Sequence, residues 1–137
     1  NTDRFAYLYK NKEKKMLFEK VEGKADFDKN LVNYVYILIR KDICPNQQSV
    51  QAVHAGMAAI HKFGNLKEDT RLVMLSVQNE EELLLWKDKV DLNGLNNEIF
   101  FEPDNNTGWS SLATAPISYK DGKLFKKLRK WSILEAI

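Results

Sequence analysis

The stretch VYILIRKDICPNQQSVQAVHAG, residues 35–56, contains the change of pattern that decides the fold. Its first part continues a nearly unbroken apolar run from Tyr34, which is typical of a strand buried on both faces. After Pro45 the apolar residues recur at helical spacing, which predicts a helix from Gln47 to a stop at Gly64. The stripe expected to pack on the sheet contains Val50, Val53, Ala55, Met57, Ala58 and Ile60.

The following residues repeat this alternation of strand and helix. We predict a second buried strand over 70–77, and then an amphipathic helix over 79–90 that Asn79 caps. Two further strands are expected over 98–102 and 109–115. This order of elements predicts an α/β fold, a three-layer sandwich with a mixed four-stranded central sheet and helices on both faces.

The two ends of the chain are interpreted separately. Residues 4–23, RFAYLYKNKEKKMLFEKVEG, contain two apolar stretches around a polar turn, which predicts a β-hairpin within residues 1–30. Residues 118–137 fit either a helix or a short helix followed by an edge strand. The prediction is therefore a single domain, 1–137, with its core over 31–117, an N-terminal hairpin and a basic C-terminal element.

The composition bounds the class of protein. Of the 137 residues, 44% are hydrophobic and 29% are charged, which is typical of a globular domain and excludes a disordered chain. No apolar run approaches the roughly 18 residues of a membrane span, so no membrane partner is expected. The single cysteine, Cys44, allows no intramolecular disulfide and no cysteine zinc site, which favours a cytoplasmic protein.

Two classes of site are not expected from the motifs. The sequence has neither a glycine-rich dinucleotide loop nor a Walker loop, and we predict no cofactor and no metal. The net charge of +2 is too small to imply nucleic-acid binding by itself. Six basic residues nevertheless lie within eleven positions near the C-terminus, opposed only by Asp121: Lys120, Lys123, Lys126, Lys127, Arg129 and Lys130. They form either a solvated face or a surface for a tRNA phosphate backbone.

Three fragments stand in a specific order: IRKD at 39–42, QAVHAG at 51–56 and FEPDNNTGWSSLATAPI at 101–117. This order resembles the peptidyl-tRNA hydrolase family of the archaeal and eukaryotic type. That family has a strand ending in Arg-x-Asp, a helix with Gln-x-x-His-Ala, and a late aspartate before a small-residue strand. The resemblance covers about residues 32–117 and implies a mixed four-stranded sheet between helices.

The resemblance also implies an activity, which is hydrolysis of the ester of peptidyl-tRNA or an N-blocked aminoacyl-tRNA. On this basis Asp104 and His54 orient the attacking water, while Gln51 and Ser110 polarise the ester carbonyl. Gln47 stands where the family has a lysine, so a glutamine amide replaces a positive charge there. The predicted substrate-binding residues are Gln47, Arg40, Asp42, Lys126, Lys127, Arg129 and Lys130.

Each candidate residue also has an ordinary structural explanation. His54 could be a core histidine, Asp104 a turn residue that accepts from its own backbone, and Asn46 or Ser49 a helix cap. At the level of function, the main alternative is a catalytically impaired tRNA-binding or regulatory module on the same fold. A domain that binds only proteins is a third alternative. The partners expected are tRNA, a second copy of the chain in a homodimer, and a protein that binds the N-terminal hairpin.

Overall fold

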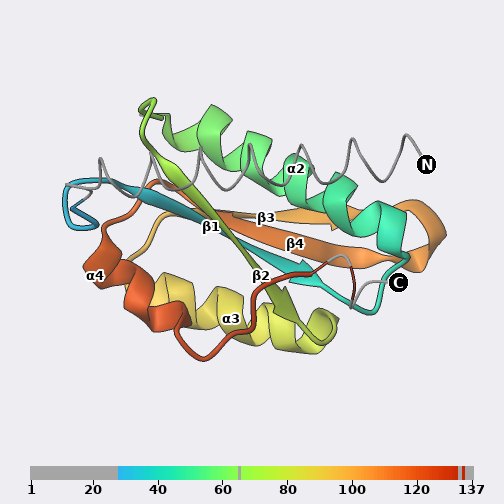
Figure 1. Cartoon of the computed structure of the whole chain (residues 1–137). Coiled ribbons are helices and arrows are strands. Elements are labelled where there is room, and N and C mark those ends of the chain that lie inside the picture. Colours follow the sequence, from blue (N-terminus) through green and yellow to red (C-terminus); the bar gives the residue numbers. More distant parts are fainter. Residues whose placement is uncertain (1–27, 65, 133, 135–137) are drawn as a thin grey trace, which may run out of the picture.

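The computed structural model describes residues 28–64, 66–132 and 134, so the hairpin predicted over residues 4–23 lies outside the described residues. Figure 1 shows the arrangement of the elements. The strands are β1 (Tyr34–Arg40), β2 (Arg71–Val77), β3 (Asn97–Glu102) and β4 (Gly108–Thr114), and the long helices are α2 (Pro45–Phe63) and α3 (Glu80–Leu92). Short helical turns follow at η1 (Asp104–Asn106), α4 (Tyr119–Gly122) and η2 (Lys123–Phe125).

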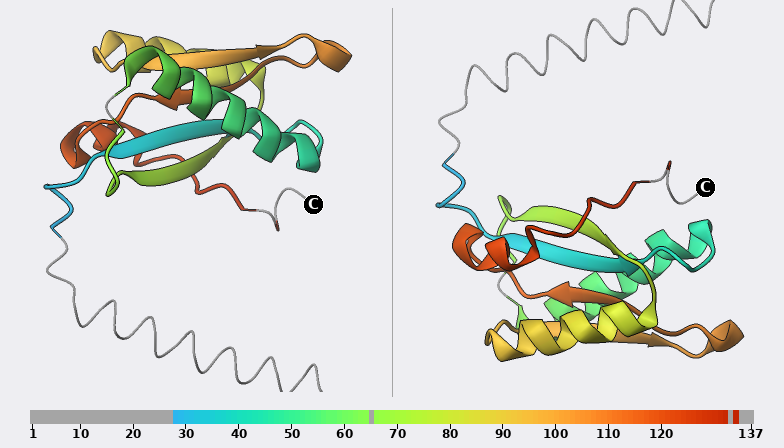
Figure 2. Two further views of the ribbon diagram at one scale, coloured as in Figure 1. Left: turned by 90° about the horizontal axis from the view of Figure 1, so that it is seen from above. Right: turned by 90° about the horizontal axis from the view of Figure 1, so that it is seen from below.

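The four strands form one mixed sheet in the order β2-β1-β4-β3. Strands β1 and β2 are parallel, whereas β4 is antiparallel to both β1 and β3. Helix α2 covers one face of the sheet, and α3 with α4 covers the other (Figures 1 and 2). The predicted α/β sandwich with a mixed four-stranded sheet is therefore confirmed.

Strand β1 lies at the centre of the core, as its apolar run predicts. All seven of its residues are buried. Alternate side chains of a strand point to opposite faces, so Tyr36 and Leu38 join the core beneath α3 while Ile37 and Ile39 join the core beneath α2. The polar side chain of Arg40 ends this strand, and it is buried as well.

The helix and its end at Gly64 are predicted correctly, but the stripe predicted for α2 is right only for Ala55 and Ile60, which pack on the sheet. The side chains of Val50, Val53 and Met57 are exposed, by 43%, 59% and 66%. The buried residues are Gln48, Gln51, Ala52, Ala55 and Ala59. Alanines allow the helix to approach the sheet closely, which leaves the larger apolar side chains on the neighbouring, outward face.

The N-terminus of α2 also differs from the expectation. The helix begins at Pro45, two residues before the predicted start, and Cys44 occupies the N-cap without a side-chain hydrogen bond. Neither capping alternative, Asn46 or Ser49, is therefore used. By contrast, Asn79 caps α3 as predicted, because its side-chain oxygen accepts a hydrogen bond from the Glu82 backbone amide at 2.9 Å. None of the helices in the described part of the chain is long and apolar enough to cross a membrane.

Strand β2 is an edge strand, so the prediction that it is buried holds only for its second half. Leu72 is 60% exposed, whereas Leu75 and Val77 are buried. The C-terminal segment runs antiparallel along this edge, with one bridge between Leu75 and Lys130. Of the two alternatives for the tail, the short helix followed by an edge strand is the nearer one, although the described residues form an isolated bridge and not a strand.

Candidate functional site

A pocket of about 550 Å³ lies where β1 ends, between the first turns of α2 and the loop that joins β3 to β4. The end of β1 leads directly into α2, whereas the β3–β4 loop comes much later in the chain. This loop lies beside them because β1 and β4 are paired at the centre of the sheet. Five residues that the sequence predicts as functional line this pocket: Arg40, Asp42, Gln47, Gln51 and Asp104.

Arg40 holds this end of the sheet together. Its guanidinium forms a bidentate pair with Asp42, with distances of 2.9 and 3.0 Å. One guanidinium nitrogen, Nη1, also donates to the backbone carbonyls of Thr107 and Trp109. The substrate-binding role predicted for Arg40 and Asp42 stays a prediction. In the structure the two side chains bind one another, and Arg40 fixes the β3–β4 loop.

Gln51 is buried and lies at the centre of a hydrogen-bond chain. Its side-chain oxygen accepts from Ser110 Oγ at 2.8 Å, and its nitrogen donates to Glu102 Oε2 at 2.9 Å. Ser110 has no exposed surface, so it cannot touch a substrate. The polarising roles predicted for Gln51 and Ser110 stay predictions. In the structure Ser110 donates to Gln51, and Gln51 donates to Glu102.

Glu102 is the residue that the sequence analysis missed. Its second oxygen, Oε1, accepts from the Asp104 backbone amide at 3.1 Å. The hydrogen bond from Gln51 and then the one from the Asp104 backbone hold the pKa of Glu102 below its ordinary value of 4.5. Glu102 is therefore a carboxylate at neutral pH. Its position at the end of a strand, two residues before Asp104, is the sequence feature that could have identified Glu102 as a site residue.

Asp104 begins the turn η1 and is exposed. Its backbone carbonyl accepts from the Thr107 amide at 3.1 Å and from Thr107 Oγ1 at 2.8 Å, which closes a tight turn. Asn105 and Asn106 both have a φ of 56°, in the left-handed region that asparagine tolerates. Within the described residues the Asp104 carboxylate accepts no backbone hydrogen bond, so the explanation as a turn-forming aspartate does not apply.

His54 lies on the exposed side of α2 and does not line the pocket. Its ring stacks on Phe100, with a centroid distance of 4.5 Å and an interplanar angle of 4°. The exposure of His54 contradicts the alternative of a core histidine, whereas its water-orienting role stays a prediction. The charge of His54 is a minor cause of the lowered pKa of Glu102.

The basic residues of the tail are not brought to this pocket. Lys120 lies in α4 and the others follow it, and α4 covers the sheet face opposite α2 (Figure 1). Among the residues that line the pocket, the only cation is Arg40, and it is paired with Asp42. Glu102 and Asp104 therefore give the pocket negative charge. In the described part of the chain, no cluster of His, Cys, Asp and Glu side chains could hold a metal ion.

Replacing Gln51 by leucine is expected to raise the pKa of Glu102 toward 4.5, because the hydrogen bond from Gln51 is the largest cause of its lowering. An NMR titration of the side-chain carboxyl carbons measures this change. Gln47→Leu is the matched control, since it removes an amide from the same helix and leaves the bond between Gln51 and Glu102 intact. An unchanged Glu102 midpoint in Gln51→Leu would contradict the assignment.

The same hydrogen bonds give the stability a defined dependence on pH. The folded-state pKa of Glu102 is lower than its unfolded-state pKa, so ionised Glu102 favours folding at pH values above 4.5. This contribution is lost as the pH falls from 4.5 through the lower folded-state pKa.

No protein-family model matches the chain, and a search of curated proteins finds no match.

Proposed function

We propose that this protein hydrolyses the ester bond of peptidyl-tRNA or an N-blocked aminoacyl-tRNA and releases free tRNA. The observation that carries the proposal is the shared pocket. Arg40, Gln51 and Asp104 belong to three separate fragments that resemble one hydrolase family, and all three line it. The first two fragments adjoin in the chain, but the third is distant in sequence, so its place at the same pocket supports the resemblance.

The reaction needs a positioned water and a group that takes its proton. Asp104 is the exposed carboxylate of the pocket, so it orients the water and accepts its proton as the oxygen attacks the carbonyl carbon. The bond from that carbon to the ribose oxygen of tRNA then breaks, and the proton passes to the leaving oxygen. The Gln47 amide and backbone amides of the loop face the developing oxyanion.

Gln51, Ser110 and Glu102 act as positioning residues in this proposal. The chain of hydrogen bonds runs from Ser110 through Gln51 to Glu102, and from there to the backbone amide of Asp104. It fixes the start of η1, and with it the direction of the Asp104 carboxylate. A general base must lie within hydrogen-bond reach of its water, so a fixed loop contributes directly to rate.

The charge of the pocket limits how tRNA can bind. Glu102 and Asp104 form no ion pair with a cation of the pocket lining, so their negative charges repel phosphates. The pocket therefore admits the acyl ester and leaves the phosphate backbone outside. Lys126, Lys127, Arg129 and Lys130, all beyond this pocket, are the proposed phosphate contacts. Their contribution is electrostatic, and the affinity for tRNA is expected to fall steeply as salt is added.

A second candidate function, a catalytically impaired tRNA-binding or regulatory module, is favoured by one observation. The pocket holds no unpaired cation among its lining residues, since Arg40 is committed to Asp42 and the family's lysine position is Gln47. Filter binding and acyl release, measured on the same N-acetyl-aminoacyl-tRNA, separate the candidates. Binding with release supports the hydrolase, and binding without release supports the module. Absence of both contradicts both candidates and favours a protein-binding domain.

Replacing Gln47 by lysine is expected to increase acyl release about tenfold, because an ammonium group stabilises an oxyanion better than a neutral amide. Initial rates at saturating substrate measure the effect. Ser49→Lys is the matched control, since it adds the same charge to the exposed surface of α2 and does not line the pocket. Equal effects of the two variants would mean that the added charge acts through tRNA attraction alone.

A further inference from the structure

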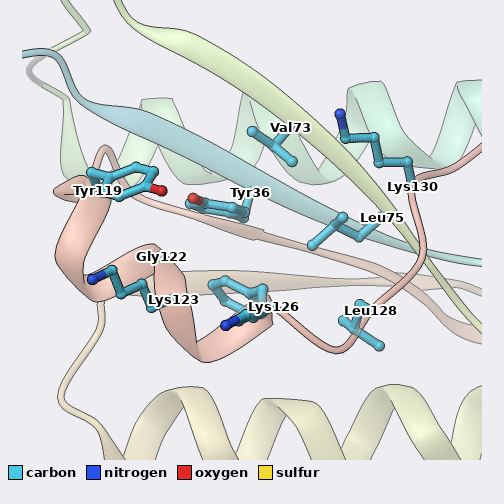
Figure 3. A pocket seen from close by; sticks show the side chains of 10 residues that line it. Tyr36, Val73, Leu75, Tyr119, Gly122, Lys123, Lys126, Leu128 and Lys130 are labelled. Carbon is cyan, nitrogen blue, oxygen red and sulfur yellow. The ribbon is translucent and has the colours of Figure 1, made fainter. Parts of the chain in front are cut away.

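A second pocket, of about 370 Å³, lies on the face of the sheet opposite α2 (Figure 3). It is bounded by β1 and β2 on one side and by the turn of α4 and η2 on the other. Apolar side chains from distant segments line it, namely Val73, Leu75 and Leu128. It shares no lining residue with the candidate active site.

The edge of this pocket is positively charged. Lys123, Lys126 and Lys130 line it, all three are exposed, and no carboxylate is among the lining residues. The ion pairs found in the described part of the chain involve none of these lysines. Within residues 28–64, 66–132 and 134, no carboxylate therefore pairs with these lysines, and their charges attract an anion from solvent.

A hydrogen-bond donor lies beside the apolar wall. The Tyr36 side chain is largely buried and stacks on Phe125, with ring centroids 4.8 Å apart. Its hydroxyl lies against Gly122, where an added Cβ would come within 2.0 Å of the oxygen. Burial raises the pKa of Tyr36, so the hydroxyl keeps its proton and can donate it. Glycine at position 122 is what allows the turn to approach this hydroxyl.

We propose that this second pocket binds a small organic anion with an apolar body. The anionic group lies between the ammonium groups of Lys123 and Lys126, and the apolar body lies against Val73, Leu75 and Leu128. Both parts are needed, because exposed lysines alone bind anions weakly and an apolar concavity alone gives no charge selectivity. The proposal does not depend on the hydrolase, and it goes beyond tRNA binding by the tail.

The neighbouring lysines 126 and 127 provide a sharp test. Both are exposed, and Lys126→Glu and Lys127→Glu change the net charge equally, but only Lys126 lines the pocket. The probe is 1-naphthyl phosphate, titrated into the isotope-labelled full chain and followed by NMR. We expect shifts at Val73, Leu75 and Leu128, with affinity at least tenfold weaker in Lys126→Glu and within threefold of wild type in Lys127→Glu.

Two further probes each carry only one of the two features of the ligand, the charge or the apolar body. Inorganic phosphate carries the charge without the apolar body, and 1-naphthol carries the body without the charge. Both are expected to bind at least tenfold more weakly than 1-naphthyl phosphate. Equal weakening by the two lysine variants, equal binding of inorganic phosphate, or shifts confined to other surfaces would overturn the proposal. Adenosine monophosphate and 4-phenylbutyrate then distinguish a nucleotide from a carboxylate ligand by their relative affinities.

Discussion

Asp104→Asn is expected to slow acyl release from N-blocked aminoacyl-tRNA by about 100-fold or more, the usual contribution of a positioned general base. Asparagine has nearly the same shape but cannot accept the proton of the attacking water. Asp104 is exposed, and its backbone hydrogen bonds to Glu102 and Thr107 do not involve its carboxylate. The variant is therefore expected to fold normally and to bind tRNA with wild-type affinity.

The control for this variant is Asp88→Asn, which makes the same change at an exposed position of α3 on the opposite face of the sheet. Its release rate is expected to equal that of the wild type. A loss of affinity for tRNA together with activity would indicate that Asp104 binds the substrate. An unchanged release rate in Asp104→Asn would remove this residue from the mechanism.

Arg40→Ala is expected to lower the free energy of unfolding by about 2 to 4 kcal/mol. The guanidinium is buried and joins Asp42 to the carbonyls of Thr107 and Trp109, so its loss leaves several acceptors without a partner. Asp42 is 40% exposed and can be rehydrated in part, so we expect less than the largest losses known for buried ion pairs.

Urea unfolding followed by circular dichroism measures this change. Lys41→Ala is the control, since it removes the neighbouring cation, which lies outside the pocket lining. Its effect is expected to stay within about 0.5 kcal/mol. A loss below about 1 kcal/mol in Arg40→Ala would mean that the β3–β4 loop is fixed by other contacts.

The sheet could be predicted because its signals are local. The apolar run of β1 and the alternation of strand and helix depend on neighbouring residues, and they predicted the α/β sandwich correctly. The buried side of α2 could not be predicted in the same way. Two of its larger apolar residues, Val53 and Met57, are exposed, because the small alanine side chains on the neighbouring face permit close approach to the sheet.

The sequence motifs predicted which residues line the pocket, but they did not predict the hydrogen bonds between these residues. The short motifs gave Arg40, Gln51 and Asp104, which do share a pocket. The role of Gln51 was not predictable, because its partners Glu102 and Ser110 lie 51 and 59 positions away in the chain. Such hydrogen bonds exist only after the strands pair, and no pattern of spacing encodes them.

The C-terminal segment, residues 118–137, is also positioned by contacts that are distant in the sequence. Its charge suggested a tRNA-binding surface, and its apolar residues fitted either a helix or a short helix followed by an edge strand. In the structure Trp131 donates from its backbone to Met74 at 2.9 Å and from its indole to Gln48 at 2.7 Å. These contacts to β2 and α2 draw the segment along the sheet edge, and local helical preference does not compete with them.

The most direct test of the proposed function is the rate constant for acyl release from N-acetyl-aminoacyl-tRNA by the purified wild-type chain, with protein in excess over substrate. We predict release well above the spontaneous rate, with Asp104→Asn at or near the spontaneous rate while its binding to tRNA is retained. A wild-type rate equal to the spontaneous rate, with tRNA fully bound, would contradict the hydrolase assignment.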